Sequence, residues 1–86
     1  MRVFKYPLQV VDAQGLWLPI GAEILSVQMQ GDQLQLWALV DERLTETFHT
    51  EIVIVGTGHP VPEVKKFLGT FQMLGGSLVF HAFEGP

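Results

Sequence analysis

The sequence predicts a small all-β protein, a sandwich or partly open barrel of about six to seven short antiparallel strands with at most one short helical turn. Two observations predict this fold class. Apolar and polar residues alternate with a period of two along much of the chain, which is typical of half-buried strands. Turn signals rich in glycine and proline recur about every ten residues, which is the spacing of short antiparallel strands.

The chain has 86 residues, so we expect a single all-β domain over residues 1–86. Hydrophobic residues make up 48% of the chain and charged residues only 16%. This is apolar for so small a protein, whose surface is large relative to its volume. Because large exposed apolar patches are uncommon on monomers, the composition predicts a homo-oligomer or a surface covered by a partner.

The first strand is predicted over residues 3–11. Its apolar face consists of Phe4, Tyr6, Leu8 and Val10. Pro7 has no amide hydrogen, which confines this strand to a sheet edge or a bulge. A turn is predicted over residues 12–15, followed by a short strand over 16–18 that Pro19 ends.

A hairpin is predicted around Gly31 and Asp32, because a two-residue loop that begins with glycine suits a type II′ turn. The pairs counted outward from it are Gln30 with Gln33, Met29 with Leu34, Gln28 with Gln35, Val27 with Leu36 and Leu25 with Ala38. One face is then wholly apolar, whereas the other carries Ser26, Gln28, Gln30, Gln33, Gln35 and Trp37. A slip of one residue would invert both faces, so the register is well specified.

A loop is predicted over residues 41–45 and a strand over residues 48–55. In that strand Phe48, Thr50, Ile52 and Ile54 alternate with His49, Glu51, Val53 and Val55. A single helical turn is predicted over residues 63–67, because proline is favoured at the first position of a helix and Pro62 comes just before.

A second hairpin is predicted around Gly75 and Gly76. Its pairs are Leu74 with Ser77, Met73 with Leu78, Gln72 with Val79, Phe71 with Phe80 and Thr70 with His81. The face with Phe71, Met73, Leu78, Phe80 and Ala82 is a core face. The opposite face mixes polar and apolar groups, which is typical of an interface or a pocket wall.

The strongest candidate site is the loop Gly56-Thr57-Gly58-His59-Pro60-Val61-Pro62. Glycine allows positive φ and close approach, and proline then stiffens the chain, so His59 is presented in a defined place. We expect either a ligand contact by His59, backed by an anion nest of loop N–H groups, or a turn whose histidine caps nearby carbonyls. The Walker motif and the dinucleotide fingerprint are both absent.

Three further residues are candidate walls of the same site: Trp37, Gln72 and His81. Trp37 falls on the glutamine-rich face, where it predicts either a stacking platform for a base or an interface anchor. His81 is either a ligand contact or a half-buried residue hydrogen-bonded to Thr70. His49 is expected to be an exposed strand residue.

Composition and spacing exclude several classes of function. Without cysteine there are no disulfides, thiolate metal sites or cysteine nucleophiles. The spacing of the three histidines favours no metal site. No arrangement of acids, bases or nucleophiles predicts catalysis, so we expect neither an enzyme nor a cofactor.

The charge and the terminal sequence narrow the partners and the location. With 5 Lys and Arg against 9 Asp and Glu, the net charge is −4, which argues against binding to bulk nucleic acid. We expect no signal peptide and no transmembrane segment. A cytoplasmic location is therefore predicted.

Seven motifs lie along nearly the whole chain: Lys5-Tyr6-Pro7-Leu8, Leu18-Pro19 with Gly21-Ala22, Ile24 to Gln28, Leu36-Trp37-Ala38-Leu39-Val40-Asp41, Gly56 to Pro60, Gly69 to Gln72 with Gly75-Gly76, and Leu78 to His81. Together they resemble a family of small proteins of bacteriophages and prophages known only as a domain of unknown function. The resemblance implies a phage origin and hence the cytoplasm of the host cell. It brings no catalytic residues. Small acidic phage proteins that are not enzymes often counter host defence.

Three functions follow from the residues and the resemblance together. The first is a non-enzymatic, homo-oligomeric binding protein that sequesters a small nucleotide-like signalling molecule, using Gly56, Thr57, Gly58 and His59. The second is an inhibitor or accessory module that docks on a host or phage protein, such as a host defence protein. The third is a hydrolase of a nucleotide signal.

Overall fold

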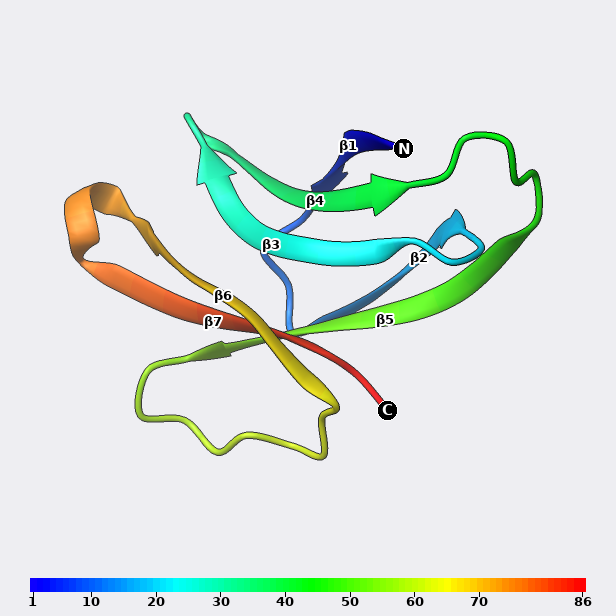
Figure 1. Ribbon diagram of the computed structural model, residues 1–86. Helices are drawn as coiled ribbons and strands as arrows, with labels where there is room; N and C mark the ends of the chain where they lie inside the picture. Colours follow the sequence, from blue (N-terminus) through cyan, green and yellow to red (C-terminus); the bar gives the residue numbers. More distant parts are fainter.

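Two antiparallel sheets pack face to face (Figure 1). The computed structural model describes residues 1–86. Its seven strands are β1 (Arg2–Leu8), β2 (Ala13–Pro19), β3 (Glu23–Gln30), β4 (Gln33–Val40), β5 (Thr47–Gly56), β6 (Lys66–Met73) and β7 (Leu78–Glu84). The three-stranded sheet has the order β1-β4-β3, and the four-stranded sheet the order β2-β5-β7-β6. The prediction of an all-β sandwich is confirmed.

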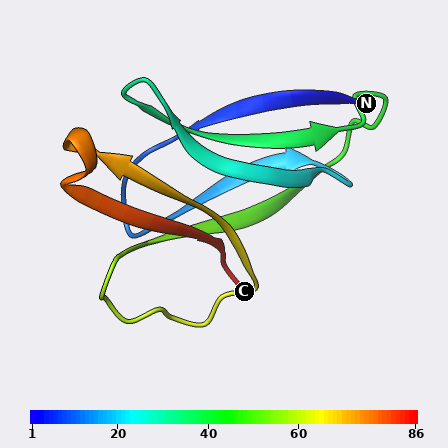
Figure 2. The same ribbon diagram turned by 60° about the vertical axis from the view of Figure 1, so that its left-hand side comes forward.

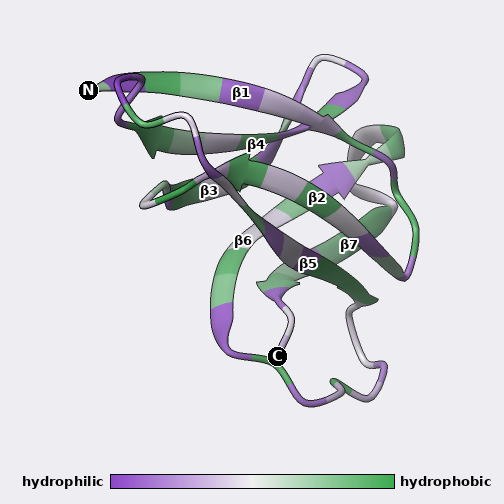
Figure 3. Ribbon diagram, turned by 90° about the vertical axis from the view of Figure 1, so that its right-hand side faces the viewer, coloured by the Kyte–Doolittle hydropathy of each residue, from purple (hydrophilic) through white to green (hydrophobic).

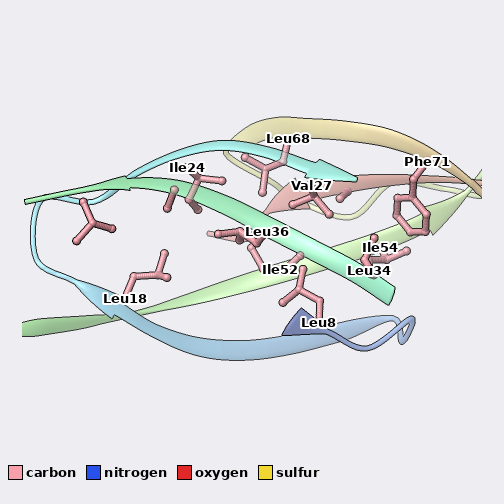
Figure 4. Close-up of a cluster of buried hydrophobic side chains, with 13 residues drawn as sticks. Leu8, Leu18, Ile24, Val27, Leu34, Leu36, Ile52, Ile54, Leu68 and Phe71 are labelled. Carbon is pink, nitrogen blue, oxygen red and sulfur yellow. The ribbon is translucent and has the colours of Figure 1, made fainter. Parts of the chain in front are cut away.

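The core lies between the two sheets (Figure 4). Its fully buried members include Val27, Leu34 and Leu36 from one sheet, and Leu18 and Ile52 from the other. Burying each such side chain stabilises the fold by about 1.5–3 kcal/mol. Alternation along the strands produces this layer, and hydrophobic and polar residues follow one another along β1 in Figure 3.

The first hairpin forms with the predicted register near its turn, from Gln30↔Gln33 to Val27↔Leu36. Beyond these pairs a β-bulge shifts the register, and Ile24 rather than Leu25 lies opposite Ala38. The predicted pairing of Leu25 is therefore wrong. The extra residue turns Leu25 outward, where it is 47% exposed, and places Ile24 in the core.

The second hairpin has four of its five predicted pairs, from Thr70↔His81 to Met73↔Leu78. The predicted pair of Leu74 with Ser77 is wrong, because Leu74 already belongs to the turn that joins the strands. The 3₁₀ turn Leu74–Gly76 (η1) joins its strands. The helical turn predicted over residues 63–67 is wrong. Pro60 and Pro62 favour extended backbone before it. The N–H of Lys65 then donates to the carbonyl of Glu84, at 2.8 Å, so the chain joins the sheet instead.

The N-terminal part differs from the prediction in where its turn lies. β1 is a sheet edge, as Pro7 predicts. The predicted strand is too long, and Val10 and Val11 are exposed in the turn after it. The Gln14 side chain closes this turn with two hydrogen bonds to the backbone of Gln9. The turn predicted over residues 12–15 is therefore wrong, because β2 already begins at Ala13.

One side of the sandwich is closed where β3 passes β6. Gly69 lies against the backbone of β3, and a Cβ added to it would be 2.4 Å from the carbonyl oxygen of Val27. Only glycine permits the two strands to come this close. This seam fixes how the two sheets sit on each other.

Candidate functional site

The predicted loop leaves β5 and crosses the outer side of the four-stranded sheet, away from the three-stranded sheet (Figures 1 and 2). Its first turn is closed by the N–H of His59, which donates to the carbonyl of Gly56 at 3.1 Å. Gly58 has φ of 88°, a conformation that a side chain would strain. The ring of His59 lies over Gly56, where an added Cβ would be 3.8 Å from its atoms.

A hollow of about 620 Å³ lies between this loop and the outer face of the sheet. Its floor includes Val53 and Val55, which face away from the core but are only 7% and 8% exposed. The side chains and backbone that line it include those of Asp12, Ala13, Glu51, Val53, Val55, Gly56, His59, Pro60, Pro62 and Glu63. Hollows of this size commonly hold small molecules.

The polar side chains of the hollow are mainly acceptors of hydrogen bonds. Three carboxylates, those of Asp12, Glu51 and Glu63, line it together with the imidazole of His59. No lysine or arginine is among the lining residues. The local field therefore favours a ligand that presents hydrogen-bond donors or positive charge, and it opposes a phosphate.

Two of the three N–H groups of the turn at residues 57–59 are occupied within the protein. The N–H of Thr57 donates to the carbonyl of Val79, at 3.1 Å, and the N–H of His59 closes the turn described above. Of the N–H groups of residues 57–59, only that of Gly58 has no partner in the chain. An anion nest needs several free N–H groups, so the loop in this conformation offers little to a phosphate.

A hydrogen-bonded row joins the loop to the sheet. The Nε2 atom of His81 is 2.7 Å from the hydroxyl of Thr57, and its Nδ1 atom is 2.9 Å from the hydroxyl of Thr70. The predicted contact with Thr70 is confirmed. The contact with Thr57 was not foreseen, and it ties His81 to the first residue of the loop.

The comparison with protein families identifies the chain. The sequence model of a family described as a domain of unknown function (DUF7352) matches residues 1–86. The chain belongs to this family. No curated protein and no solved structure matches it. Membership therefore extends over all 86 residues and carries no assigned activity.

The structure separates two of the predicted site residues of this DUF7352 domain from the loop. Trp37 lies on β4, on the outer face of the three-stranded sheet, and is therefore on the opposite side of the molecule. Gln72 lines a different hollow, with Met29 and Asp32, between the tips of the two hairpins. Gly56, Thr57, Gly58, His59 and His81 are the predicted residues that do come together.

Sequence reasoning missed the three carboxylates. Glu51 stands on the same strand face as Val53 and Val55, a signal that was present in the alternation of β5. Glu63 belongs to the loop itself, whereas Asp12 reaches the hollow only through the fold. The carbonyl of Asp12 accepts from the N–H of Ile54, at 2.9 Å, which holds the start of β2 beside the end of β5.

Exposed aromatic rings lie on the same outer face, outside the hollow. Trp17 is 64% exposed and meets His49 edge to face, with ring centroids 5.0 Å apart. His49 is exposed, and its ring lies over Gly15. Phe67 meets Phe83 in the same way, at 5.7 Å. The two ring pairs lie at opposite edges of the four-stranded sheet, one where β2 pairs with β5 and the other where β6 pairs with β7.

The histidines and carboxylates of the chain form no group of three or more that could hold a metal ion. The chain also contains no helix long and apolar enough to span a membrane.

Proposed function

We propose that this chain is a non-enzymatic binding protein that holds a small ligand in the hollow beneath the loop of residues 57–63. The observation that carries the proposal is the hollow itself. An apolar floor of Val53 and Val55 is surrounded by a few polar groups, which is the usual construction of a small-molecule site. No nucleophile or base with a positioned partner lies in the hollow, so binding is better supported than catalysis.

The ligand class that the lining supports is a nucleoside-like molecule. Carboxylates accept hydrogen bonds from ribose hydroxyls and from the amino groups of bases. The imidazole of His59 offers a face on which a base can stack. Any phosphate of the ligand would point to solvent, because Asp12, Glu51 and Glu63 oppose it inside the hollow. This revises the prediction from the glycines alone, in which an anion nest of loop N–H groups holds a phosphate.

The biological setting in this proposal is the cytoplasm of a phage-infected host. There the ligand would be a nucleotide-like signal of host defence, which the protein sequesters. The proposal includes a homo-oligomer, and thirteen large hydrophobic residues with 38% or more of their surface exposed support it. A mass measurement under native conditions tests the oligomer and any co-purified small molecule together.

Calorimetry tests the binding. The panel consists of adenosine, guanosine, their monophosphates, cyclic nucleotides and cyclic ADP-ribose isomers. We expect at least one nucleoside to bind as tightly as its monophosphate or more tightly. His59→Ala and Glu51→Gln should weaken this binding about tenfold, as expected for a lost contact worth about 1.4 kcal/mol. His49→Ala, on the same strand face as Glu51, serves as the control.

The proposal fails if no compound of the panel gives heat at tens of micromolar protein. It also fails in its ligand class if the monophosphates alone bind. Mass spectrometry of the recovered ligand must find it unchanged, because turnover would favour a hydrolase.

A second candidate function is docking on a host or phage protein. The exposed rings of Trp17 and Phe67 favour it, since exposed aromatic residues are common anchors of interfaces. A tagged protein recovered from infected cells should then carry one stoichiometric partner. Trp17→Ala should abolish that partner while His59→Ala leaves it bound. Trp37→Ala, on the opposite side of the molecule, tests whether the partner docks on that face instead.

A further inference from the structure

The strand order places His81 in the middle of a row across the four-stranded sheet. On β7 it pairs with Val55 of β5 on one side and with Thr70 of β6 on the other. Thr57 follows two residues after Val55, just beyond the end of β5. The imidazole therefore has a hydroxyl on each side, one on a strand and one on the loop.

Both ring nitrogens of His81 are used. Nε2 is 2.7 Å from the Thr57 hydroxyl, and Nδ1 is 2.9 Å from the Thr70 hydroxyl. A neutral imidazole has one donor and one acceptor, whereas each hydroxyl can donate and accept. Both hydrogen bonds therefore form in either tautomer. The Thr57 hydroxyl has a further acceptor in the carbonyl of Val79, at 3.4 Å.

Thr57 is the point at which the loop is held. Its N–H and its hydroxyl both face Val79, and its hydroxyl faces His81. The residues on either side, Gly56 and Gly58, give the backbone the most freedom a chain can have. The backbone conformation of the turn therefore depends on how firmly Thr57 is fixed.

We infer that His81 is a positioning residue for the ligand loop: it fixes Thr57, and through Thr57 it sets the turn that carries His59. The inference deepens the proposed function and rests on it for its effect on binding. The expected effect of His81 on the loop does not depend on the proposed function. His81 is half-buried on the outer face and lies outside the hydrophobic core, so its loss should loosen the loop more than the fold.

Two substitutions of His81 test the contacts of the two ring nitrogens separately. The terminal amide of glutamine reaches about as far as Nε2, and that of asparagine about as far as Nδ1. His81→Gln should therefore keep the contact with Thr57, whereas His81→Asn should keep only the contact with Thr70. Thr57→Val and Thr70→Val are the matched pair on the partner side.

The readout that needs no ligand is amide hydrogen exchange at residues 57 and 59, whose N–H groups donate to Val79 and Gly56, followed by NMR. We expect exchange at both to be about five- to tenfold faster in His81→Asn and Thr57→Val, which corresponds to the loss of one hydrogen bond. His81→Gln and Thr70→Val should stay near the unmodified protein. Binding of adenosine, measured by calorimetry, should follow the same order.

The inference is overturned if His81→Asn and His81→Gln give equal exchange, or if Thr57→Val leaves exchange unchanged. Where His81→Asn fails to fold, the comparison of Thr57→Val with Thr70→Val still decides. If exchange follows the expected order but neither adenosine nor guanosine binds to any of the proteins, the positioning role stands and the proposed ligand class fails.

Discussion

The outer faces of the two sheets are closed in different ways. On the three-stranded sheet the Lys5 ammonium donates to the amide oxygen of Gln30, at 2.7 Å, and so spans from β1 to β3 across β4. Gln35 on β4 is only 7% exposed. On the four-stranded sheet the covering is backbone, since the loop of residues 57–65 crosses the face and leaves a hollow above Val53 and Val55.

The difference shows why this hollow lies on one outer face and not on the other. Long side chains lie down on a flat sheet and leave no room between themselves and it. A loop stiffened by Pro60 and Pro62 cannot settle onto the sheet in the same way, because both residues fix φ. The space beneath it is lined by groups from distant parts of the chain, such as Asp12 and Glu51, together with Glu63 of the loop.

The largest effect is expected from Gly69→Ala, which breaks the seam on which both faces depend. The added Cβ would lie 2.4 Å from the carbonyl oxygen of Val27, so the backbones of β3 and β6 must separate. We expect the free energy of unfolding to fall by about 2–3 kcal/mol, the range for overpacking a tight site. Denaturation in urea measures it.

The matched control is Gly56→Ala, where the added Cβ meets only the His59 ring, at 3.8 Å. This is ordinary van der Waals contact, so its stability should stay within about 0.5 kcal/mol of the unmodified protein. Equal losses for the two variants would mean that β3 and β6 do not approach each other this closely.

The next effect concerns the loop alone. Gly58→Ala places a side chain at φ of 88°, which costs about 1–2 kcal/mol. No atom lies within 4 Å of the added Cβ, so the cost is backbone strain and not a clash. We expect weaker ligand binding with the core intact, measured by calorimetry beside the melting temperature. Gly58→Asn should be milder, since asparagine tolerates positive φ. Equal behaviour of alanine and asparagine would contradict the strain.

Alternation and turn residues predicted most of the fold, because those signals are local. The register of both hairpins near their turns follows from Gly31 and from the Gly75-Gly76 pair. The bulge at Leu25 could not be predicted, since Ile24 and Leu25 are both apolar and either could fill the core position opposite Ala38. Nor does any local signal bring β3 against β6; that contact depends on Gly69 being small.

The candidate site could be predicted only in its contiguous part. Residues 56–59 are adjacent in sequence, and the hairpin register alone brought Thr70 to His81. Asp12 is distant in sequence from the loop turn, and Glu63, although it belongs to the loop, gives no local signal that it lines the same hollow. The sequence placed Trp37 on the correct strand face, but it could not tell which sheet that face belongs to.

A smaller effect, and a gain, is expected on the three-stranded sheet. The Oε1 atom of Gln35 is buried without a hydrogen-bond partner, and its Nε2 atom has only a long contact of 3.5 Å to Gln30. Gln35→Met removes the unpartnered oxygen at similar volume, so we expect a gain of about 1 kcal/mol in unfolding free energy. Gln33→Met should lose stability instead, because Gln33 donates to the carbonyls of Leu8 and Leu34. A loss in both variants would show that the Gln35 oxygen has a hydrogen-bond partner in solution.

The smallest effect is expected at Asp41. Its carboxylate has a cation beside it, whereas the carboxylates of the hollow have none. The Arg43 guanidinium donates to both oxygens of Asp41, at 2.9 and 2.8 Å, and lowers the pKa of that carboxyl from 3.8 to about 2. Because the folded pKa is the lower one, ionised Asp41 favours the folded state above about pH 4. This contribution is lost as the pH falls through 2.

Arg43→Ala should raise the pKa of Asp41 most of the way back toward 3.8, as followed by NMR titration of the carboxyl carbon. It should not return fully, since the backbone N–H of residue 43 still donates to Oδ1, at 3.2 Å. Stability should hardly change, because exposed ion pairs contribute little. A pKa that stays near 2 would mean that the backbone N–H, and not the guanidinium, holds the charge. The Asp41 carboxylate would then be held only by the backbone N–H of its own turn, just as the turn at His59 is closed by the N–H of His59 and the carbonyl of Gly56.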